Sequence, residues 1–389
     1  MIQAVRLLRK NHLKINCVIN NMPVKKKIII AFGTRPELIR FAPIIHQFIK
    51  DGRVKLMLVH TGQHFSDDMN GIFFRELNIP KPDINLSVGE FSPNEQIGRI
   101  IIETGKVISK EKPDAVCVWG DTNSSLGVAI ATNKNRTKLF HLEAGCRSHD
   151  FRMAEEYNRI LIDQMSDLLF PLSQNDADNL ATERIHGQSI FLGDPLYDVF
   201  LENQKKIEPS ISENSKQTKG SILLTLHRAE NVDNPKVLEN ILNAIGKIED
   251  RDIIFPIHPR TKKMIASFGF DKLVNKNFIK IINPLGYLEL IKILHHCDLV
   301  ITDSGGLQKE AFFARKTCVT LRKSTEWLDT TRLKVNILLD PEEELMVKLP
   351  EVCQNYKKTN KLFDSISEQP YGDGRSAEKI VDKIIDIAN

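Results

Sequence analysis

Residues 24–49 read VKKKIIIAFGTRPELIRFAPIIHQFI. The apolar, β-branched run that ends at Gly33 is typical of a buried strand that leads into a turn. Pro36 then takes the favoured first position of a helix, and apolar residues recur on one face of that helix as far as Ile49. A strand followed at once by an amphipathic helix is the repeating unit of an α/β domain.

The same unit recurs along the chain. Further strands are predicted at 54–60, 115–120, 137–143, 221–226, 252–257, 278–282, 298–302 and 317–321. Helical segments lie between most of them, and this alternation predicts parallel sheets with helices on both faces. We therefore predict an α/β protein of two doubly wound, Rossmann-like domains that face each other across a cleft.

The pattern is interrupted after Gly193-Asp194-Pro195, so the domain boundary is expected near 193–205. The polar stretch 202–220 lacks apolar periodicity and predicts a surface loop or linker. The predicted limits are 1–22 for an N-terminal extension, 23–195 for the first domain and 196–373 for the second. A final amphipathic helix is predicted within 374–389, where it can pack on either domain.

Composition narrows the classes of function. A chain of 389 residues suits two domains. Its net charge of +4 suits a small anionic substrate, and no Lys/Arg block with interleaved aromatic residues indicates nucleic-acid binding. The six cysteines form no C-x-x-C pair, which favours a reducing compartment, the cytoplasm. The sequence contains no run of 18 consecutive apolar residues, so no membrane-spanning helix is predicted.

Ligands of open α/β sheets bind beyond the carboxyl ends of the strands, so residues that follow predicted strands are the first candidates. After the first strand, Arg35 offers a forked cation at a helix N-terminus, where anions bind. Arg40 lies one turn further and can join it or face solvent. Asp121 follows the strand at 115–120 and is either a helix N-cap or a functional carboxylate.

Two further carboxylates stand out in the first half. Glu143 ends the strand at 137–143 in an apolar context, where a carboxylate is rare unless it is paired or functional. Glu155 begins a predicted helix, whose positive N-terminus suits it. It can pair with Arg159, four residues later, or serve as an acid or base.

In the second half, His227 and Arg228 follow the strand at 221–226 and offer a titratable donor beside a permanent cation. His258 follows the next strand in the same way. A lone histidine is usually structural, but two at neighbouring strand ends favour an anion site together.

The sharpest local feature is Thr302–Glu310, which reads TDSGGLQKE. Ser304, Gly305 and Gly306 form a turn that opens a helix, and its amides can cradle a diphosphate. Glu310, one turn into that helix, is placed to accept hydrogen bonds from ribose hydroxyls. The chain contains neither a P-loop nor a G-x-G-x-x-G motif, which disfavours ATP hydrolysis and NAD binding.

Taken together, eight motifs resemble the non-hydrolysing UDP-N-acetylglucosamine 2-epimerase family. They are GTRPE (33–37), TGQH (61–64), GDTNSS (120–125), HLEAGCRS (141–148), AEEYNR (154–159), TLHRAEN (225–231), PIHPR (256–260) and TDSGGLQKEA (302–311). The resemblance runs from about Lys27 to the C-terminus. It implies a glycosyltransferase-B-type fold, no cofactor or metal, a homodimer, and a final helix that crosses back onto the first domain.

The resemblance also implies a role for each site residue. Three carboxylates would handle the C2 proton and assist the departure of UDP, His227 would act at the diphosphate, and other residues would hold UDP or mediate regulation by UDP-N-acetylglucosamine. The carboxylates are Asp121, Glu143 and Glu155; the phosphate and UDP ligands are Arg35, Ser304, Gly305, Gly306 and Glu310; the regulatory set is Gln63, Arg228 and His258.

Several alternatives stay open on the sequence. Residues Ser324–Trp327 depart from the family's usual Thr-Glu-Arg-Pro and resemble the branch that acts on UDP-2,3-diacetamido-2,3-dideoxyglucuronate. A glycosyltransferase with the same fold would not need the three carboxylates. A non-catalytic UDP-sugar sensor would be expected to lack them. The implied biological role is the synthesis of precursors for surface polysaccharides or other glycans.

Overall fold

The computed structural model describes residues 25–62, 74, 78–89, 91–218, 220–248, 250–343 and 345–388. The N-terminal extension predicted at 1–22 lies outside this set, and so does Gln63 of the expected site.

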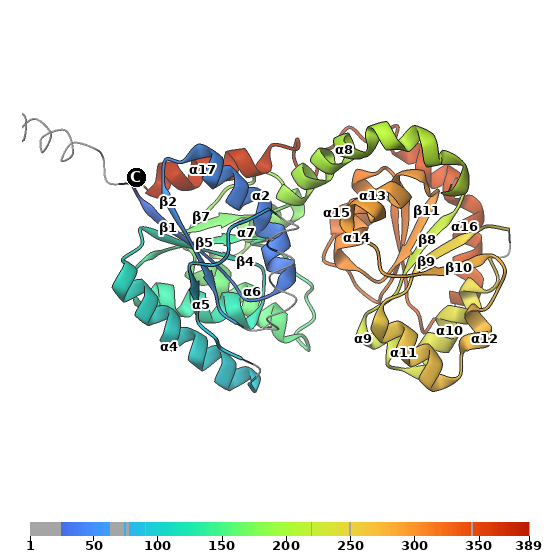
Figure 1. The fold of residues 1–389 in the computed structure, drawn as a ribbon, viewed down its shortest axis with the longest axis horizontal. Coiled ribbons are helices and arrows are strands. Elements are labelled where there is room, and N and C mark those ends of the chain that lie inside the picture. The colour runs from blue at the N-terminus through green and yellow to red at the C-terminus, as the bar shows by residue number, and fades with distance from the viewer. Residues whose placement is uncertain are drawn as a thin grey trace, which may run out of the picture.

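Two α/β lobes make up the molecule, each with a parallel sheet between layers of helices (Figure 1). The strands of the first sheet are β1 (Lys27–Phe32), β2 (Lys55–His60), β3 (Ile84–Asn85), β4 (Ala115–Trp119), β5 (Lys138–Leu142), β6 (Leu168–Phe170) and β7 (Gln188–Ser189). Those of the second are β8 (Ile222–Thr225), β9 (Ile253–Pro256), β10 (Ile279–Ile282), β11 (Leu299–Thr302), β12 (Thr317–Leu321) and β13 (Asn336–Leu339). All nine predicted strands are confirmed, and β3, β6, β7 and β13 were not predicted.

In each sheet the strand order runs outward in both directions from the first strand of the domain and its neighbour. The order is β3-β2-β1-β4-β5-β6-β7 in the first sheet and β10-β9-β8-β11-β12-β13 in the second. The switch points therefore lie between β1 and β4 and between β8 and β11, where crevices for ligands form at the carboxyl ends of the strands.

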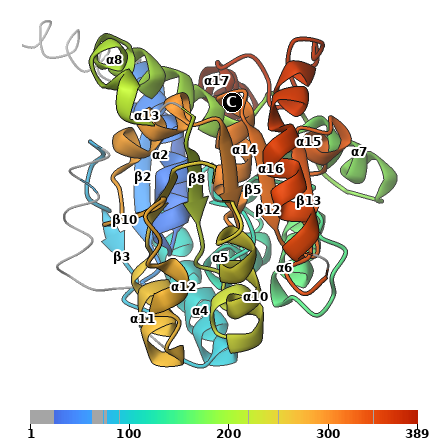
Figure 2. The same cartoon turned by 90° about the vertical axis from the view of Figure 1, so that its right-hand side faces the viewer.

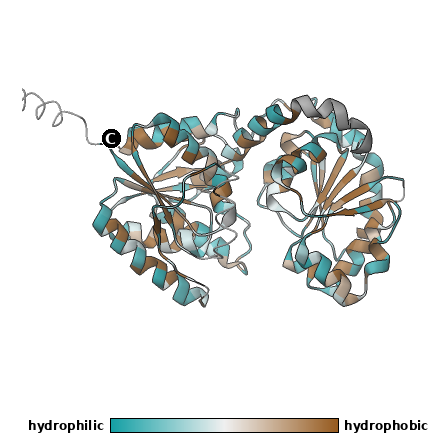
Figure 3. Cartoon of the chain, in the orientation of Figure 1, coloured by the Kyte–Doolittle hydropathy of each residue, from teal (hydrophilic) through white to brown (hydrophobic). Residues whose placement is uncertain are grey.

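The helices of the first domain are α2 (Arg35–Asp51), α4 (Pro93–Glu111), α5 (Asn123–Lys134), α6 (Ala154–Met165), α7 (Gln174–Thr182) and α17 (Ser376–Ala388). Helices α2 and α17 cover one face of its sheet, and α4 to α6 cover the other. The predicted apolar face of α2 is buried except at Ile49, which is 52% exposed. Figure 3 shows the apolar strands inside both lobes.

The helices of the second domain are α9 (Ala229–Val232), α10 (Pro235–Ile245), α11 (Pro259–Phe268), α12 (Asp271–Val274), α13 (Tyr287–His296), α14 (Gly305–Phe313), α15 (Leu328–Arg332) and α16 (Leu345–Leu362). One face of its sheet packs against α10 and α16, and the other packs against α13, α14 and α8 (Pro195–Thr218). Buried strands with helices on both faces are what the near-continuous apolar runs predicted.

Helix α8 corrects the expectation of a loop at 202–220. The segment continues as helix to Thr218, and it joins the two lobes in Figure 1. Phe200 and Ile207, seven residues apart on one face, are buried against the second domain. Glu, Gln and Lys have high helix propensity, so these two anchors are enough to order a stretch that lacks an apolar stripe.

The two segments that join the domains touch backbone to backbone. Gly193 has φ +100°, and a Cβ on it would lie 2.9 Å from the carbonyl oxygen of Tyr371 and 3.0 Å from Cα of Gly372. The amide of Asp194 donates to that same carbonyl at 2.9 Å. Glycine at both crossing points is therefore a steric requirement.

Helix α17 returns to the first domain, where Figure 2 shows it behind α14 and above the first sheet. Its predicted apolar face is buried in the core of that domain, through Ala377, Ile380, Val381, Ile384 and Ile385. No helix within the described ranges is both long enough and apolar enough to cross a membrane.

Candidate functional site

The candidate site lies at the two switch points. A cavity of about 380 Å³ in the first domain is lined by Arg40, Asp121 and Glu155. A second cavity, of about 400 Å³, lies between the domains and is lined by Glu155, Arg228 and Arg322. Glu155 lines both cavities, so Asp121 of the first domain and the cations of the second face adjacent cavities.

Glu143 lies behind the first cavity, against two of the residues that line it, Trp119 and Arg40. Its backbone is left-handed, with φ +68°, which is uncommon for a residue with a side chain. Its Oε2 accepts a hydrogen bond from Nε1 of Trp119 at 2.6 Å and pairs with the guanidinium of Arg40. Oε1 accepts no hydrogen bond from any described residue, so one carboxylate oxygen is held and the other is available.

The side chain of Arg40 is 32% exposed and pairs with Glu143. Burial alone would lower its pKa, but the carboxylates of Glu143 and Asp121 outweigh that effect and raise the pKa of Arg40. The guanidinium is therefore a fixed positive charge between two carboxylates, and it keeps them close without neutralising the cavity.

Asp121 is not the cap of the helix that follows it. Thr122 caps α5, by accepting from the amide of Ser125 at 3.1 Å. Asp121 instead pairs with Arg159 at 2.5 Å, while its side chain stays 26% exposed. Burial raises the pKa of Asp121, and Arg159 opposes this rise. A raised pKa allows this carboxyl to carry a proton nearer to neutral pH.

The pair expected between Glu155 and Arg159 does not form. Arg159 is buried and pairs with Asp121 and, at 2.7 Å, with Glu156. Glu156 is fully buried because the amides of Ser148 and His149 also donate to it. Glu155, on the exposed side of α6, lines both cavities and makes no ion pair with a described residue.

Glu37, which the sequence analysis did not single out, organises this end of the sheet. Its carboxylate accepts from the amides of Gly33 and Thr34 at 2.8 Å, and from the hydroxyls of Thr122 and Ser125 at 2.6 and 2.9 Å. It therefore joins the turn after β1 to the turn after β4. A glutamate three residues after Thr34, at a helix start, is the capping-box signal that could have revealed it.

In the second domain, Asp303 is fully buried at the end of β11. It accepts from the amides of His227 and Arg228 at 3.0 Å, and Nδ1 of His227 lies 3.2 Å from it. Burial lowers the pKa of His227. Arg228 and His258 lower it further, whereas the carboxylate of Asp303 raises it. The rings of His227 and His258 lie 5.8 Å apart, as expected of residues at neighbouring strand ends.

The turn at Ser304–Gly306 opens α14 as predicted, with Ser304 as its N-cap. Glu310 is 7% exposed and lies beside Tyr287 and Lys309. Burial raises the pKa of Glu310 to about 7, although both neighbours lower it.

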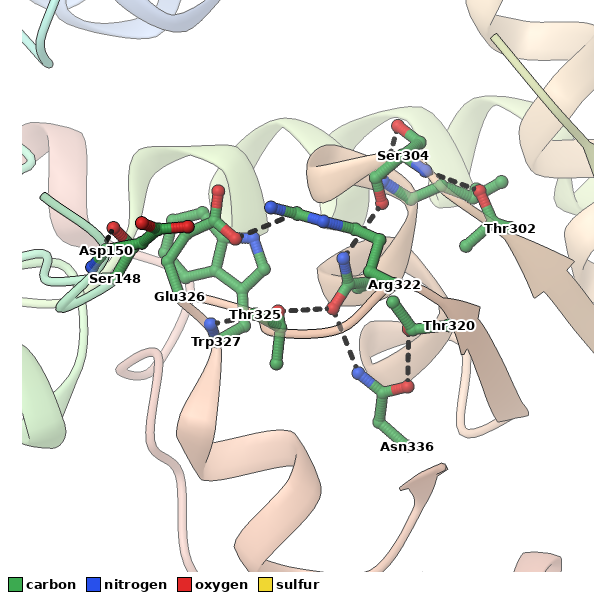
Figure 4. Close-up of polar contacts among 12 residues, drawn as sticks. Ser148, Asp150, Thr302, Ser304, Thr320, Arg322, Thr325, Glu326, Trp327 and Asn336 are labelled. Atoms are coloured by element: carbon green, nitrogen blue, oxygen red, sulfur yellow. Dashed lines mark hydrogen bonds and ion pairs between the residues drawn. The ribbon is translucent and has the colours of Figure 1, made fainter. Parts of the chain in front are cut away.

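A further cluster lies beyond β12, shown in Figure 4. Arg322 pairs with Glu326 at 2.9 Å, and both are buried. Thr325 donates to Oε1 of Gln308 at 2.7 Å, which fixes the loop against α14. Trp327 is 3% exposed. The sequence analysis noted this segment only as a departure from a family pattern.

The side chains of two predicted site residues lie outside the part of the chain that the structure describes. Of Arg35 only the backbone is described, as the first residue of α2, and Gln63 is outside the described set. Within the described ranges, no group of three or more His, Cys, Asp or Glu side chains is arranged to bind a metal ion.

Comparison with known proteins adds the family. The chain matches the family described as UDP-N-acetylglucosamine 2-epimerase over residues 46–385. A UDP-N-acetylglucosamine 2-epimerase from Methanocaldococcus jannaschii is 42% identical, over 91% of this chain and 98% of the relative. A UDP-2,3-diacetamido-2,3-dideoxy-D-glucuronate 2-epimerase from Pseudomonas aeruginosa is 38% identical, over 92% of this chain and 98% of the relative.

The fold is found in solved structures as well. A crystal structure of Methanocaldococcus jannaschii UDP-GlcNAc 2-epimerase in complex with UDP-GlcNAc and UDP gives a TM-score of 0.79 at 41% identity. The match covers 92% of this chain and 99% of the other. The predicted class, two Rossmann-like domains of the glycosyltransferase-B type, is confirmed.

Proposed function

Because the chain belongs to the UDP-N-acetylglucosamine 2-epimerase family, and is therefore an epimerase, we propose that it interconverts UDP-N-acetylglucosamine and UDP-N-acetylmannosamine. Membership of this family disfavours the two rival readings of the sequence, a glycosyltransferase and a non-catalytic sensor.

The proposed route begins at C1 because the C2 proton of the sugar is not acidic by itself. The C1–O bond breaks and its electron pair leaves with UDP. A carboxylate then removes the C2 proton, and the electrons of that C–H bond form the double bond of 2-acetamidoglucal. In the return steps C2 receives a proton from the opposite face, and UDP adds again to C1. No net oxidation or reduction occurs.

The observation that carries this proposal is the geometry of Glu143. Trp119 and Arg40, which line the same cavity as Asp121 and Glu155, fix one of its oxygens, and the other accepts no hydrogen bond from a described residue. An orientated carboxylate of this kind is what a proton transfer at carbon requires. The raised pKa of Asp121 suits a group that holds a proton, so the cavity can contain an acid and a base together.

We assign the departure of UDP to the second domain. The amides at the start of α14, with Ser304, Gly305 and Gly306, would hold the diphosphate. His227 and Arg228 would support the negative charge that develops on it when the C1–O bond breaks. Glu310 would accept from the ribose hydroxyls, and Arg35 would hold phosphate from the first domain. His258 lies beside His227, and with Gln63 and Arg228 it would take part in any regulation by substrate.

The pairing of cations in the second cavity favours a sugar without a charged C6 group. Arg152, Arg322 and Lys323 line that cavity, but they pair with Asp150, Glu326 and Glu342. Arg228 is the one cation lining it that has no ion pair with a described residue, and the diphosphate needs it. A uronate would require a further free cation, so we prefer UDP-N-acetylglucosamine to the diacetamido-uronate that the Pseudomonas relative is named for.

The test is proton NMR of the enzyme with UDP-N-acetylglucosamine in D2O. We expect UDP-N-acetylmannosamine with deuterium at C2, formed about 1,000-fold more slowly by Glu143→Gln. A product that retains the original proton at C2 would refute the proton-exchange route. Turnover of the diacetamido-uronate alone would keep the reaction and replace the sugar. Inactivity on both would refute the proposed function.

We also propose that the enzyme is a cytoplasmic homodimer that supplies precursors for surface polysaccharides or other glycans. The domain limits that we propose are 23–195 with the C-terminal helix for the first domain, and 196–373 for the second. These points rest on the family resemblance. Light scattering after size-exclusion chromatography would test the dimer, and a mass of one chain would refute it.

A further inference from the structure

The first observation concerns the indole of Trp327. Its Nε1 is buried and has no hydrogen-bond partner among the described residues. Buried N–H groups are nearly always paired, because an unpaired donor has lost water without gaining another acceptor. An orphaned donor therefore indicates an acceptor that binds from outside the protein.

The second observation concerns where this N–H lies. A Cβ built on Gly305, in the first turn of α14, would be 3.5 Å from Nε1 of Trp327 and 3.7 Å from Nη2 of Arg228. Oε1 of Glu326 would be 4.0 Å away, but Arg322 pairs with that carboxylate. Two nitrogen donors thus converge on the space that Gly305 leaves open by having no side chain.

The third observation is that the indole is held rigidly in this position. Nζ of Lys309 lies 3.9 Å from the centre of the ring and pairs with Asp194 at 2.6 Å, and both charges are buried. The hydroxyl of Thr325 accepts from the amide of Trp327, and the hydroxyl of Thr330 donates to its carbonyl oxygen at 2.8 Å. Figure 4 shows Trp327 next to Glu326 in this loop.

From these observations we infer that the indole N–H of Trp327 donates a hydrogen bond to a diphosphate oxygen of the bound nucleotide. The oxygen would lie against Cα of Gly305, at the positive end of α14, with Trp327 on one side and Arg228 on the other. Lys309 is a positioning residue, because it fixes the ring without reaching the ligand. The inference rests on the proposed function, since it assumes that UDP binds at this turn.

The chain offers a direct spectroscopic test, because it contains only two tryptophans. The enzyme labelled with 15N-tryptophan gives two indole resonances, and Trp119→Phe assigns them. We expect UDP to move the indole proton of Trp327 downfield, as a hydrogen bond to an anion does. Uridine, which has no phosphate, should leave it unchanged. An equal response to uridine and UDP would point to a change of conformation and overturn the inference.

Affinity gives an independent readout. Trp327→Phe keeps an aromatic ring beside Lys309 but removes the N–H together with part of the indole, so we expect the Kd for UDP to rise about tenfold. Gly305→Ala should fold, because its new methyl would meet no atom closer than 3.5 Å. It would fill the proposed oxygen site, so we expect UDP binding to weaken by at least the same factor.

The outcomes separate this inference from the proposed function. If UDP binds to the wild type and to Trp327→Phe equally, and the Trp327 resonance does not move, the inference is wrong and the epimerase proposal stands. If the wild type binds no UDP, both are wrong. If Trp327→Phe does not fold, the resonance of the wild-type indole still decides the matter.

Discussion

Asp121 and Asp303 occupy the same topological position in the two domains and behave differently. Each follows the strand that pairs with the first strand of its domain, β4 beside β1 and β11 beside β8, so each lies at a switch point. Asp121 is 26% exposed and pairs with a side chain from another helix, whereas Asp303 is fully buried and accepts from backbone amides. The same residue type at the same sheet position thus lines a cavity in one domain and holds the backbone in the other.

This contrast extends to the two halves of the cleft. In the first half, side chains are fixed against one another, as Glu143 is against Arg40 and Trp119. In the second half, the backbone is fixed and the donors of Trp327 and Arg228 are left free. Under the proposed function, the first half would transfer the proton and the second half would bind the diphosphate.

The largest expected effect sharpens this division. We expect Glu143→Gln to lower kcat by about 1,000-fold, since it removes an acid or base from carbon chemistry. The Kd for UDP should change less than about threefold, because UDP binds in the other half. NMR kinetics and calorimetry measure the two quantities. A large loss of UDP affinity would break the proposed division of roles.

The next prediction compares the same substitution, Asp to Asn, at the two aspartates. Asp303→Asn should lower the free energy of unfolding by on the order of 4 kcal/mol, because it leaves buried donors without their charged acceptor. Asp121→Asn should change stability by less than about 1 kcal/mol and lower kcat by about 100-fold. Urea unfolding with activity assays would separate them. Equal destabilisation by both variants would show that the two positions are equivalent after all.

A third prediction uses pH. Burial raises the pKa of Glu310 from 4.5 to about 7, so folding favours its neutral form. The wild type should therefore lose stability as pH rises from 4.5 through 7, by about 3 kcal/mol relative to Glu310→Gln. Unfolding at pH 5 and pH 8 measures this difference. A wild type whose stability relative to Glu310→Gln stays constant or rises from pH 5 to pH 8 would contradict it.

The smallest effect compares the two helix caps. Thr122 caps α5 at 3.1 Å and also donates to Glu37, whereas the bond to Ser304 from Leu307 is 3.4 Å long. Thr122→Ala should cost about 1 kcal/mol of stability, and Ser304→Ala a few tenths of that. Thermal unfolding of the two variants gives the order, and the reverse order would mean that the second turn is the more tightly held.

Much of the fold follows from apolar patterning. Runs such as 115–120 and 317–321 predict buried strands because both faces of a parallel sheet are covered. Strands β3 and β7 span two residues each and have no such run. Helix α8 was mistaken for a loop because its order comes from contacts with the second domain, made through Phe200 and Ile207. Tertiary contacts of this kind leave little trace in local periodicity.

The sequence indicated where the candidate site residues lie better than it indicated which residues they pair with. Strand ends correctly indicated where Asp121, Glu143, His227 and Ser304 would lie. The sequence could not indicate that Arg159 pairs across to Asp121 in place of Glu155, since this depends on how α6 meets the strand end. It also could not separate Asp121 from Asp303. Two aspartates that follow buried strands look alike until the surrounding donors are known.

Helix α17 gives the first domain an unusual order of assembly. The core of that domain includes Ile380, Val381 and Ile384 of α17, while the core side chains from outside α17 precede α8. During synthesis the second domain can therefore complete its core while the first is still waiting for these residues. A nascent chain exposes the apolar surface that α17 will cover until translation reaches them. The half that carries the proposed acid and base residues would thus become complete last.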